Sequence, residues 1–337
     1  MPQAMLKRFF RYLYSRRDAA CLALALILLV AAAFKPTVPV PRNIYSYLFV
    51  VDITQSMNAK GMYWNGQEVS RLEYTKRMLH DTIATMPCGS RVSVALFAGF
   101  STASLYMPIE VCSNYAAIQD TIAHMDWRMA WSGNSRLRDG VESIGRLLRT
   151  MSEPAQVVFF TDGEEAPLLH AFNTKDLSNF QGRGWLIVGI GSDEGVPIPK
   201  LDESNKVIGY WSAENFQLQP GVAQISQQNQ GVRSDNVAVG ESDRYQSKLD
   251  EEYLKSLTEE INGIYLRGDS LQRLRSALTE LKPARRDFAP MQVDWILALA
   301  AAVLVISAYT PQRLLHLLRR LYSRKPKPAQ RTSSPRP

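Results

Sequence analysis

Short apolar segments alternate with amphipathic segments through the middle of the chain. The segment Tyr45–Val51 is apolar without interruption, as expected of a strand that is buried on both faces of a parallel sheet. The segment Arg71–Met86 instead gathers its apolar residues on one side, which is typical of a helix that packs against a sheet. Such an alternation predicts an α/β fold, doubly wound around a mostly parallel sheet of roughly six strands. Further strands are predicted at Arg91–Phe97, Ser104–Val111, Val157–Phe160, Trp185–Ile190 and Gly263–Leu266, and further helices at Tyr115–Met125, Leu137–Met151, Leu249–Ile261 and Leu271–Leu281.

The segment 192–248 interrupts this alternation. It is rich in Gln, Asn, Ser and Gly, and turn signals stand at Asp202–Asn205 and Gln219–Gly221. We expect a hairpin near Pro197–Trp211 and an irregular course in the rest of the segment. The folded domain is therefore predicted to span residues 45–287, with an irregular polar insertion at 192–248.

Two uncharged apolar runs flank this domain. The runs at 19–34 and 295–312 are 16 and 18 residues long, near the lower edge of the roughly 17–25 residues that cross a bilayer as a helix. We predict a transmembrane helix or signal anchor in the first run and a transmembrane helix over 293–312. A cleaved signal peptide is the alternative for the first run, because Ala31–Ala33 would suit a cleavage site. The region between the two runs is exported whether the first run is an anchor or a cleaved signal peptide.

The charge distribution supports this topology. The net charge of +7 and the pI of about 9.3 would, taken alone, suggest a nucleic-acid partner. The tails at 1–18 and 313–337, however, hold thirteen basic groups and one acid, whereas residues 19–312 carry a net charge of −5. Basic tails beside apolar runs follow the positive-inside rule. We therefore expect cytoplasmic tails, a bacterial inner membrane, a Pro-rich spacer at 35–44, a periplasmic domain and no nucleic-acid partner.

Cysteine usage agrees with an exported domain. Cys21 lies in the first apolar run, which leaves Cys88 and Cys112 in the exported region. Two cysteines in an oxidising compartment predict one disulfide, and two unrelated buried thiols are the alternative. The sequence contains no C-x-x-C pair, so neither a redox motif nor a zinc ribbon is supported.

Oxygen-bearing side chains follow the ends of two predicted strands. The first strand runs into Asp52, Thr54 and Ser56, whose spacing points all three oxygens toward one side of an extended loop. Asp162 follows another strand, and Ser135 lies in a Gly-rich turn before a helix. Ligands of open α/β sheets bind where the strands end, so these residues are expected to converge. An all-oxygen set with two carboxylates predicts Mg²⁺, with Mn²⁺ or Ca²⁺ as alternatives.

The motifs D-x-T-x-S, Gly133-Asn134-Ser135 and T-D-G occur here in the order found in a known family. They resemble the von Willebrand factor A domain with its metal-ion-dependent adhesion site (MIDAS), over about residues 45–282. The resemblance implies that five residues bind the metal: Asp52, Thr54, Ser56, Ser135 and Asp162. The family more often has Ser where Thr54 stands and Thr where Ser135 stands, and both exchanges keep a hydroxyl. A degraded site without metal is the alternative.

Two narrower resemblances suggest different roles. The stretches Gly189–Gly195 and Leu249–Leu254 are similar to membrane-flanked A-domain proteins of the bacterial Bat type, which implies a component of envelope stress response or secretion. The stretches Pro87–Arg91, Glu110–Cys112 and Trp127–Trp131 resemble MxaL-type accessory proteins encoded with periplasmic PQQ-dependent methanol dehydrogenase. That resemblance implies a maturation factor that helps assembly or metal insertion, with the dehydrogenase or its other accessory proteins as partner.

Four further residues border the predicted metal site. Glu164 and Glu165 follow Asp162, and their negative potential suits a second cation or a basic partner, although a solvated rim is the simpler interpretation. Trp127 and Trp131 flank the Gly-rich turn, where they serve either packing or partner contact. We predict that these four residues form a partner-binding rim.

Catalysis is not expected. The sequence contains no H-E-x-x-H, G-x-S-x-G or P-loop motif, and its four histidines show no partner spacing. The remaining enzymatic alternative is a hydrolase that uses the cation as a Lewis acid and Glu164 or Glu165 as general base. The sequence thus predicts a membrane-anchored, non-enzymatic protein that binds a partner through a divalent cation, with an Asp or Glu of the partner completing the ligands.

Overall fold

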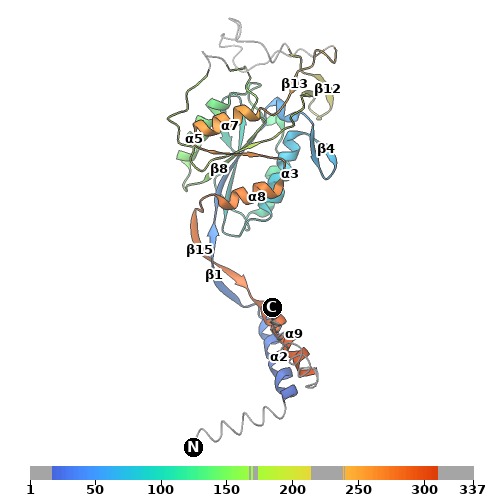
Figure 1. Cartoon of the computed structure of the whole chain (residues 1–337), viewed down its shortest axis with the longest axis vertical. Coiled ribbons are helices and arrows are strands. Elements are labelled where there is room, and N and C mark those ends of the chain that lie inside the picture. The colour runs from blue at the N-terminus through green and yellow to red at the C-terminus, as the bar shows by residue number, and fades with distance from the viewer. Residues whose placement is uncertain (1–16, 167, 170–173, 214–237, 239, 310–337) are drawn as a thin grey trace, which may run out of the picture. The chain divides into compact units, whose positions relative to one another are not determined.

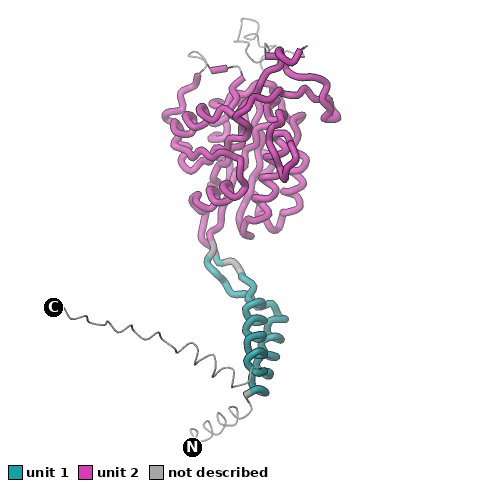
Figure 2. Tube along the Cα trace, turned by 45° about the vertical axis from the view of Figure 1, so that its right-hand side comes forward, with its two compact units in different colours: residues 1–41, 288–337 teal, residues 42–287 magenta. Residues whose placement is uncertain are grey.

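The computed structural model describes residues 17–166, 168–169, 174–213, 238 and 240–309. Two compact units are present, one formed by residues 42–287 and the other by residues 1–41 together with 288–337 (Figure 2). The tails predicted at 1–18 and 313–337 lie almost entirely outside the described residues. Part of the polar insertion, 214–237, also lies outside them.

The first and last parts of the described chain form two helices and two strands. α2 (Arg17–Ala33) packs along α9 (Asp294–Tyr309), and β1 (Thr37–Ile44) pairs with β15 (Arg285–Gln292) in a two-stranded sheet. Where we expected a spacer at 35–44, the chain therefore forms a strand. A two-stranded ladder leaves one edge of each strand unpaired, so prolines without an N–H are tolerated. Within the described residues, none of the helices has the length and apolar character that a membrane crossing requires.

The larger unit is built on a mixed sheet with the strand order β14-β9-β8-β2-β5-β6, and β7 also pairs with β5. The antiparallel strands β6 (Ser101–Ser104) and β7 (Ile109–Glu110) replace the single edge strand expected over Ser104–Val111. That expectation was wrong because Pro108 has no N–H for the ladder, so the chain leaves the sheet between the two strands.

The α/β fold is confirmed. Its parallel strands are β2 (Ser46–Asp52), β5 (Arg91–Ala98), β8 (Gln156–Thr161), β9 (Leu186–Gly189) and β14 (Ile264–Arg267).

Helices cover both faces of the sheet (Figure 1). The central strand β2 shows how: Tyr47, Phe49 and Val51 belong to one core, and Leu48 and Val50 belong to the other. Successive side chains of a strand point to opposite faces, so a strand buried on both sides is apolar throughout. The first core lies under α3 (Arg71–Ile83), α4 (Tyr115–Ala123) and α8 (Leu271–Glu280), and the second lies under α5 (Leu137–Thr150) and α7 (Glu251–Glu260).

A short hairpin that the sequence analysis did not predict follows the first strand of the sheet. β3 (Met62–Trp64) and β4 (Gln67–Val69) are joined by Asn65 and Gly66, whose φ angles are +51° and +81°. Asn-Gly is the pair that tolerates positive φ at both positions of a tight turn, and this signal was available in the sequence. The hairpin separates the first metal-site motif from α3.

The insertion folds back on itself. β11 (Pro199–Leu201) and β12 (Val207–Tyr210) confirm the hairpin expected near Pro197–Trp211. β10 (Val196–Pro197) then pairs with β13 (Gln246–Ser247), so that the last residues of the insertion return to its beginning. This return brings β13 beside the carboxyl ends of the central strands.

The predicted disulfide between Cys88 and Cys112 is confirmed, with the Cα atoms 5.2 Å apart. Glu110 joins the two cysteine-bearing turns, because Oε1 accepts a hydrogen bond from Gly89 N at 2.6 Å and Oε2 accepts one from Ser113 N at 2.6 Å. Partial burial pushes the pKa of Glu110 upward, but hydrogen bonds from the Ser113 hydroxyl and from the backbone outweigh it and lower the pKa to about 2.

The variant Glu110→Gln is expected to be less stable than the wild type by about 1 kcal/mol at pH 7, because one carboxylate oxygen becomes an amide NH2 that cannot accept a hydrogen bond, and the bonds to the other oxygen lose their charge. The folded-state pKa of Glu110 lies below its ordinary value of 4.5, so this stabilisation is complete above pH 4.5 and is lost as the pH falls toward 2. Urea unfolding of both proteins at pH 7 and pH 3 measures the change. A stability difference that is the same at both pH values would contradict the prediction.

Candidate metal centre

Asp52 is the last residue of β2 and is completely buried at the carboxyl edge of the sheet. Its Oδ1 accepts hydrogen bonds from the backbone N and the hydroxyl of Thr54, at 2.9 and 2.7 Å, and its Oδ2 accepts one from the Thr161 hydroxyl at 2.7 Å. The carboxylate therefore orients Thr54 and joins the ends of β2 and β8. It supplies negative charge behind the hydroxyls without itself lining the adjacent cavity.

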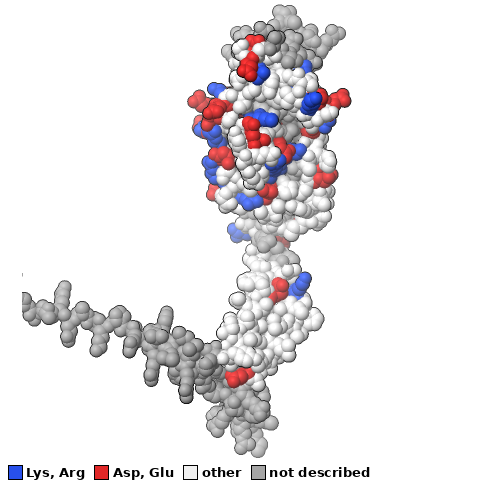
Figure 3. Space-filling model, turned by 90° about the vertical axis from the view of Figure 1, so that its right-hand side faces the viewer, with Lys and Arg blue, Asp and Glu red and all other residues white. Residues whose placement is uncertain are grey.

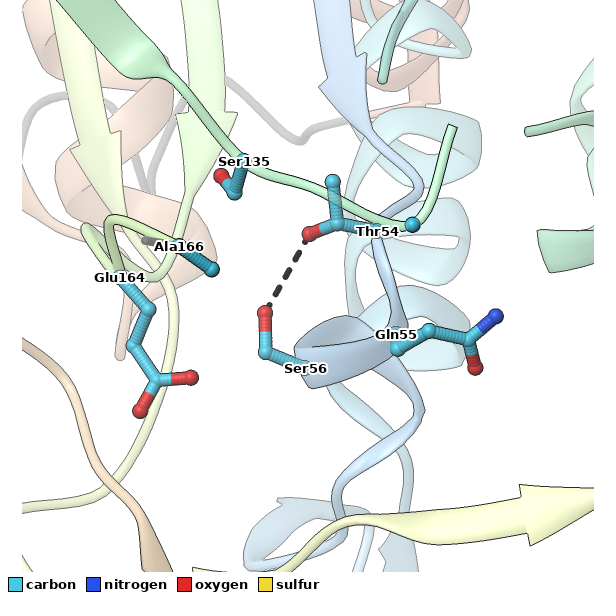
Figure 4. Close-up of a pocket in the computed structure, with 7 residues that line it drawn as sticks. Thr54, Gln55, Ser56, Ser135, Glu164 and Ala166 are labelled. Carbon is cyan, nitrogen blue, oxygen red and sulfur yellow. Dashed lines mark hydrogen bonds between the residues drawn. The ribbon is translucent and has the colours of Figure 1, made fainter. Parts of the chain in front are cut away.

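A small cavity lies beside the residues that follow Asp52 in the chain (Figure 4). The short helix η1 (Gln55–Asn58) begins after Thr54 and turns Ser56 back, so that the two hydroxyl oxygens lie 3.3 Å apart. Figure 4 shows both hydroxyls on one side of the cavity, with Ser135 and Glu164 across from them. The cavity has a volume of about 10 Å³, which is close to what one water molecule needs. The lining residues are Thr54, Gln55, Ser56, Gly133, Ser135, Glu164 and Ala166.

Ser135 reaches the cavity from the loop before α5. Its backbone N donates to Ala166 O at 2.9 Å, and Ala166 N donates back to Ser135 O at 2.7 Å. This reciprocal pair fixes the loop against the segment that follows β8. Ser135 is only 3% exposed, yet its hydroxyl oxygen has no hydrogen-bond partner. An unpaired buried hydroxyl costs about 1–3 kcal/mol, so a ligand in the cavity would be a stabilising partner.

Asp162 follows β8 and is also completely buried, but its carboxylate is engaged by a cation of the chain itself. Oδ2 accepts a hydrogen bond from Arg71 Nη1 at 2.7 Å, and both side chains are fully inaccessible to solvent. Arg71 Nη1 also donates to Ser247 Oγ at 2.6 Å and to Ser56 O at 3.4 Å. The structure thus brings Asp162 to the same edge as Asp52, but faces it toward Arg71.

The two glutamates after Asp162 have different surroundings. Glu164 lines the cavity; its Oε1 accepts a hydrogen bond from the Tyr245 hydroxyl at 3.2 Å, while its buried Oε2 has no partner. Glu165 turns the other way, and its Oε1 accepts hydrogen bonds from Leu137 N at 3.1 Å and from the Tyr253 hydroxyl at 2.6 Å. Glu165 therefore caps the start of α5, whereas Glu164 faces the predicted metal site.

Negative charge accumulates in this region without enough positive charge to balance it. Burial raises the pKa of Asp52 to about 7, with a further contribution from Asp162. Burial and the nearby Asp162 likewise raise the pKa of Glu164 to about 8, and burial raises that of Glu165 to about 7. A divalent cation in the cavity would relieve this repulsion.

The residues fit a hard divalent cation. The polar side chains that line the cavity offer oxygen, two of those oxygens are buried without a partner, and the cavity has room for one small ion or water. Mg²⁺, Mn²⁺ and Ca²⁺ prefer such ligands, whereas zinc sites draw mainly on cysteine and histidine.

Exposed apolar side chains occur in segments close in sequence to residues that line the cavity. Trp131 is 44% exposed, and its Nε1 donates to Ser101 Oγ at 3.2 Å. Phe100, next in sequence to Ser101, and Met129 are exposed by 52% and 42%. Trp127 is half-buried, and its Nε1 donates to Asn205 Oδ1 at 2.6 Å at the tip of the β11–β12 hairpin. Of the two predicted rim tryptophans, Trp131 is thus exposed and Trp127 is engaged by the hairpin.

Four residues that shape the site were missed by the sequence analysis. Arg71 carried a signal, because a cation in the first turn of a helix opposes the helix dipole and so indicates an anionic partner. Thr161 was visible as the first residue of T-D-G. Tyr245 and Ser247 had no local signal, since Tyr245 lies 81 residues from the Glu164 that it contacts.

One known domain family matches a part of the chain that includes the candidate metal centre. Residues 47–165 match the von Willebrand factor type A domain, and this stretch contains all five predicted metal-site residues. This stretch is therefore similar to a von Willebrand factor A domain, as the sequence motifs predicted.

The relatives and solved structures that resemble this chain share low sequence identity with it. UPF0353 proteins of Mycobacterium sp. strains KMS and JLS are each 24% identical over 297 residues, which cover 86% of this chain and 76% of the relative. An aerotolerance-related membrane protein from Bacteroides fragilis is 20% identical with a TM-score of 0.46, covering 70% of this chain and 98% of that chain. BatB from Bacteroides thetaiotaomicron is 17% identical with a TM-score of 0.48 and the same coverage.

Proposed function

We propose that this chain is a membrane-anchored periplasmic protein that binds a partner protein through a divalent cation in its A domain. The observation that carries the proposal is the cavity lined by the hydroxyls of Thr54, Ser56 and Ser135, with the carboxylates of Asp52 and Asp162 behind it. Mg²⁺ is the expected ion, and Mn²⁺ and Ca²⁺ are the alternatives. When bound, the ion supplies a positive charge that attracts a carboxylate of the partner.

The residues around the cavity prepare this interaction. Asp52 holds the Thr54 hydroxyl in place, and the Ser135–Ala166 backbone pair holds the Ser135 hydroxyl. Because these groups are already fixed, little conformational entropy is lost when an ion or a partner binds. The described histidines His80 and His124 each lie within ion-pair distance of an aspartate on a helix surface.

Exposed apolar side chains on α2 and α9 support the proposed membrane attachment, although neither helix is long enough within the described residues to cross a bilayer. Leu26 and Ile27 of α2 are 63% and 62% exposed, and Leu299 and Ile306 of α9 are 61% and 66% exposed. The face shown in Figure 3 has few charged side chains on these helices, whereas the larger unit carries both signs. Large exposed apolar surfaces mark contact with lipid or with another protein.

For the partner we propose a periplasmic PQQ-dependent methanol dehydrogenase or another of its accessory proteins, with this chain acting in assembly or metal insertion. The support is the resemblance of three short stretches to accessory proteins of that system. A Bat-type role in envelope stress or secretion is the alternative.

Affinity capture from solubilised membranes tests the function. The tagged full-length chain should retain its partner in Mg²⁺ and release it in EDTA, because the ion joins the two proteins. Dehydrogenase subunits in the EDTA eluate would support the maturation role, whereas an AAA ATPase and other A-domain proteins would support the Bat-type role. Capture that is identical in Mg²⁺ and EDTA would contradict metal-dependent binding.

The variant Trp131→Ala is expected to weaken partner capture about 10-fold, since truncating an exposed aromatic contact residue typically costs 1–2 kcal/mol or more. Mg²⁺ affinity should stay unchanged, because Trp131 does not line the cavity. Biolayer interferometry with the purified partner and calorimetric titration with Mg²⁺ measure the two quantities. Tyr63→Ala is the matched control, because Tyr63 is also an exposed aromatic residue but belongs to the β3–β4 hairpin. Equal losses in both variants would contradict a specific role for Trp131.

A further inference from the structure

The two acidic residues after β8 that approach the cavity differ in how many of their oxygens are free. Asp162 uses both: Oδ2 pairs with Arg71 at 2.7 Å, and Oδ1 accepts a hydrogen bond from Glu164 N at 3.1 Å. Glu164 is less fully engaged: Oε1 accepts a hydrogen bond from Tyr245, and Oε2 has no partner within hydrogen-bond distance, although the Ser247 hydroxyl is near enough to lower the pKa of Glu164. Of these two acids only Glu164 lines the cavity.

The Arg71–Asp162 pair is held firmly on the Arg71 side. Arg71 is the first residue of α3, directly after the N-cap Ser70, so its backbone is fixed by the helix. Its Nη1 and Nη2 donate to the hydroxyl and the carbonyl oxygen of Ser247, at 2.6 and 3.0 Å. A Cβ at Gly191 would lie 3.3 Å from Arg71 Nε, so the guanidinium is closely packed on that side as well.

The charges facing the cavity follow from these contacts. Arg71 balances the charge of Asp162, and three hydrogen bonds occupy the carboxylate of Asp52. The free Glu164 oxygen therefore remains as the carboxylate ligand available to an ion, beside the unpartnered hydroxyl of Ser135.

We propose that Glu164, and not Asp162, is the carboxylate that coordinates the divalent cation, and that Arg71 keeps Asp162 out of the ligand set. This inference rests on the proposed metal-dependent function and names a ligand that the sequence motifs did not assign. Tyr245 is a positioning residue, because its hydroxyl holds Glu164 Oε1 and leaves the other oxygen for the ion. The last residues of the polar insertion thus form one wall of the site. Tyr245 contacts Glu164, and Ser247 contacts Arg71.

Mn²⁺ and Mg²⁺ titrations of the purified full-length chain test this ligand assignment. Glu164→Gln should weaken Mn²⁺ binding at least 10-fold, because an amide oxygen replaces a charged ligand, while metal-free stability is retained. Glu165→Gln is the matched control: it removes the same charge one residue away but keeps an oxygen for Leu137 N, and should change the affinity less than 3-fold. Asp162→Asn should also change the affinity less than 3-fold. If Asp162→Asn does not fold, the double variant Arg71→Met/Asp162→Asn, which removes the ion pair as a whole, replaces it.

The outcomes separate this inference from the proposed function. Wild-type protein that binds neither Mn²⁺ nor Mg²⁺ would overturn both. Wild-type binding with an unchanged Glu164→Gln variant and a strongly weakened Asp162→Asn variant would overturn the inference alone and leave the function standing. Mn²⁺ electron paramagnetic resonance adds a readout of the ligand set: its zero-field splitting should change in Glu164→Gln and stay the same in Asp162→Asn.

Discussion

Replacing Asp52 by Asn is expected to weaken Mg²⁺ binding by about 10–100-fold, the range found when the groups that orient metal ligands are removed. Asn keeps the shape of Asp and still accepts from Thr54 through Oδ1. It lacks the negative charge, however, and its amide cannot accept the hydrogen bond that Thr161 donates at 2.7 Å. The Thr54 hydroxyl then loses the charged acceptor that orients it, and the cation loses the charge behind the hydroxyls.

The fold should tolerate this change. Burial and the nearby Asp162 raise the pKa of Asp52 to about 7, so removing its charge relieves repulsion in the metal-free protein. Calorimetric titration measures Mg²⁺ affinity, and capture of the partner should fall in parallel. Asp250→Asn is a suitable control, because Asp250 caps α7 and does not line the cavity. Wild-type Mg²⁺ affinity in Asp52→Asn would show that Asp52 has no role in the site.

Replacing Arg71 by Met is expected to destabilise the protein by about 3–5 kcal/mol, the cost of breaking a buried ion pair by removing one partner. Arg71 and Asp162 are both 0% exposed, so neither solvent nor a neighbouring cation can compensate for the loss. The change also removes the donors that hold Ser247, which detaches the return of the insertion from the sheet edge. Urea unfolding at pH 7 measures the effect as a shift of the midpoint.

The double variant Arg71→Met/Asp162→Asn provides the control for this large effect. It removes both charges together and keeps an oxygen to accept from Glu164 N, so most of the lost stability should return. A single variant as stable as the wild type would mean that the ion pair contributes nothing. A double variant as unstable as the single one would assign the loss to packing around the Arg71 side chain.

The sheet and the residues at its edge could be predicted from sequence because their signals are local. The run Tyr45–Val51 is apolar throughout since β2 is buried on both faces, and D-x-T-x-S and T-D-G follow directly from strand ends. The disulfide between Cys88 and Cys112 was predicted from the expectation that this region is exported, which leaves two cysteines to pair. For the strand and the two motifs, a few consecutive residues contain the physical reason for the structure.

The orientation of the side chains could not be predicted in the same way. Asp162 matches the family motif, but its direction depends on Arg71, which is 91 residues away in sequence. The direction of Glu164 depends on Tyr245, which belongs to a segment without periodicity. Long-range polar contacts decide these orientations, and no local pattern identifies which residue each acid contacts.

The reciprocal backbone pair between Ser135 and Ala166 has a consequence for engineering. Both hydrogen bonds use main-chain atoms, so they do not depend on the side chains of the loop that leads to Ser135. Exposed positions in and beside that loop, such as Met129, Trp131 and Phe100, can therefore be randomised while the hydroxyl stays in place. A library at these three positions, selected in Mg²⁺ and eluted with EDTA, would turn the domain into a binder whose target is chosen and whose release is controlled by a chelator.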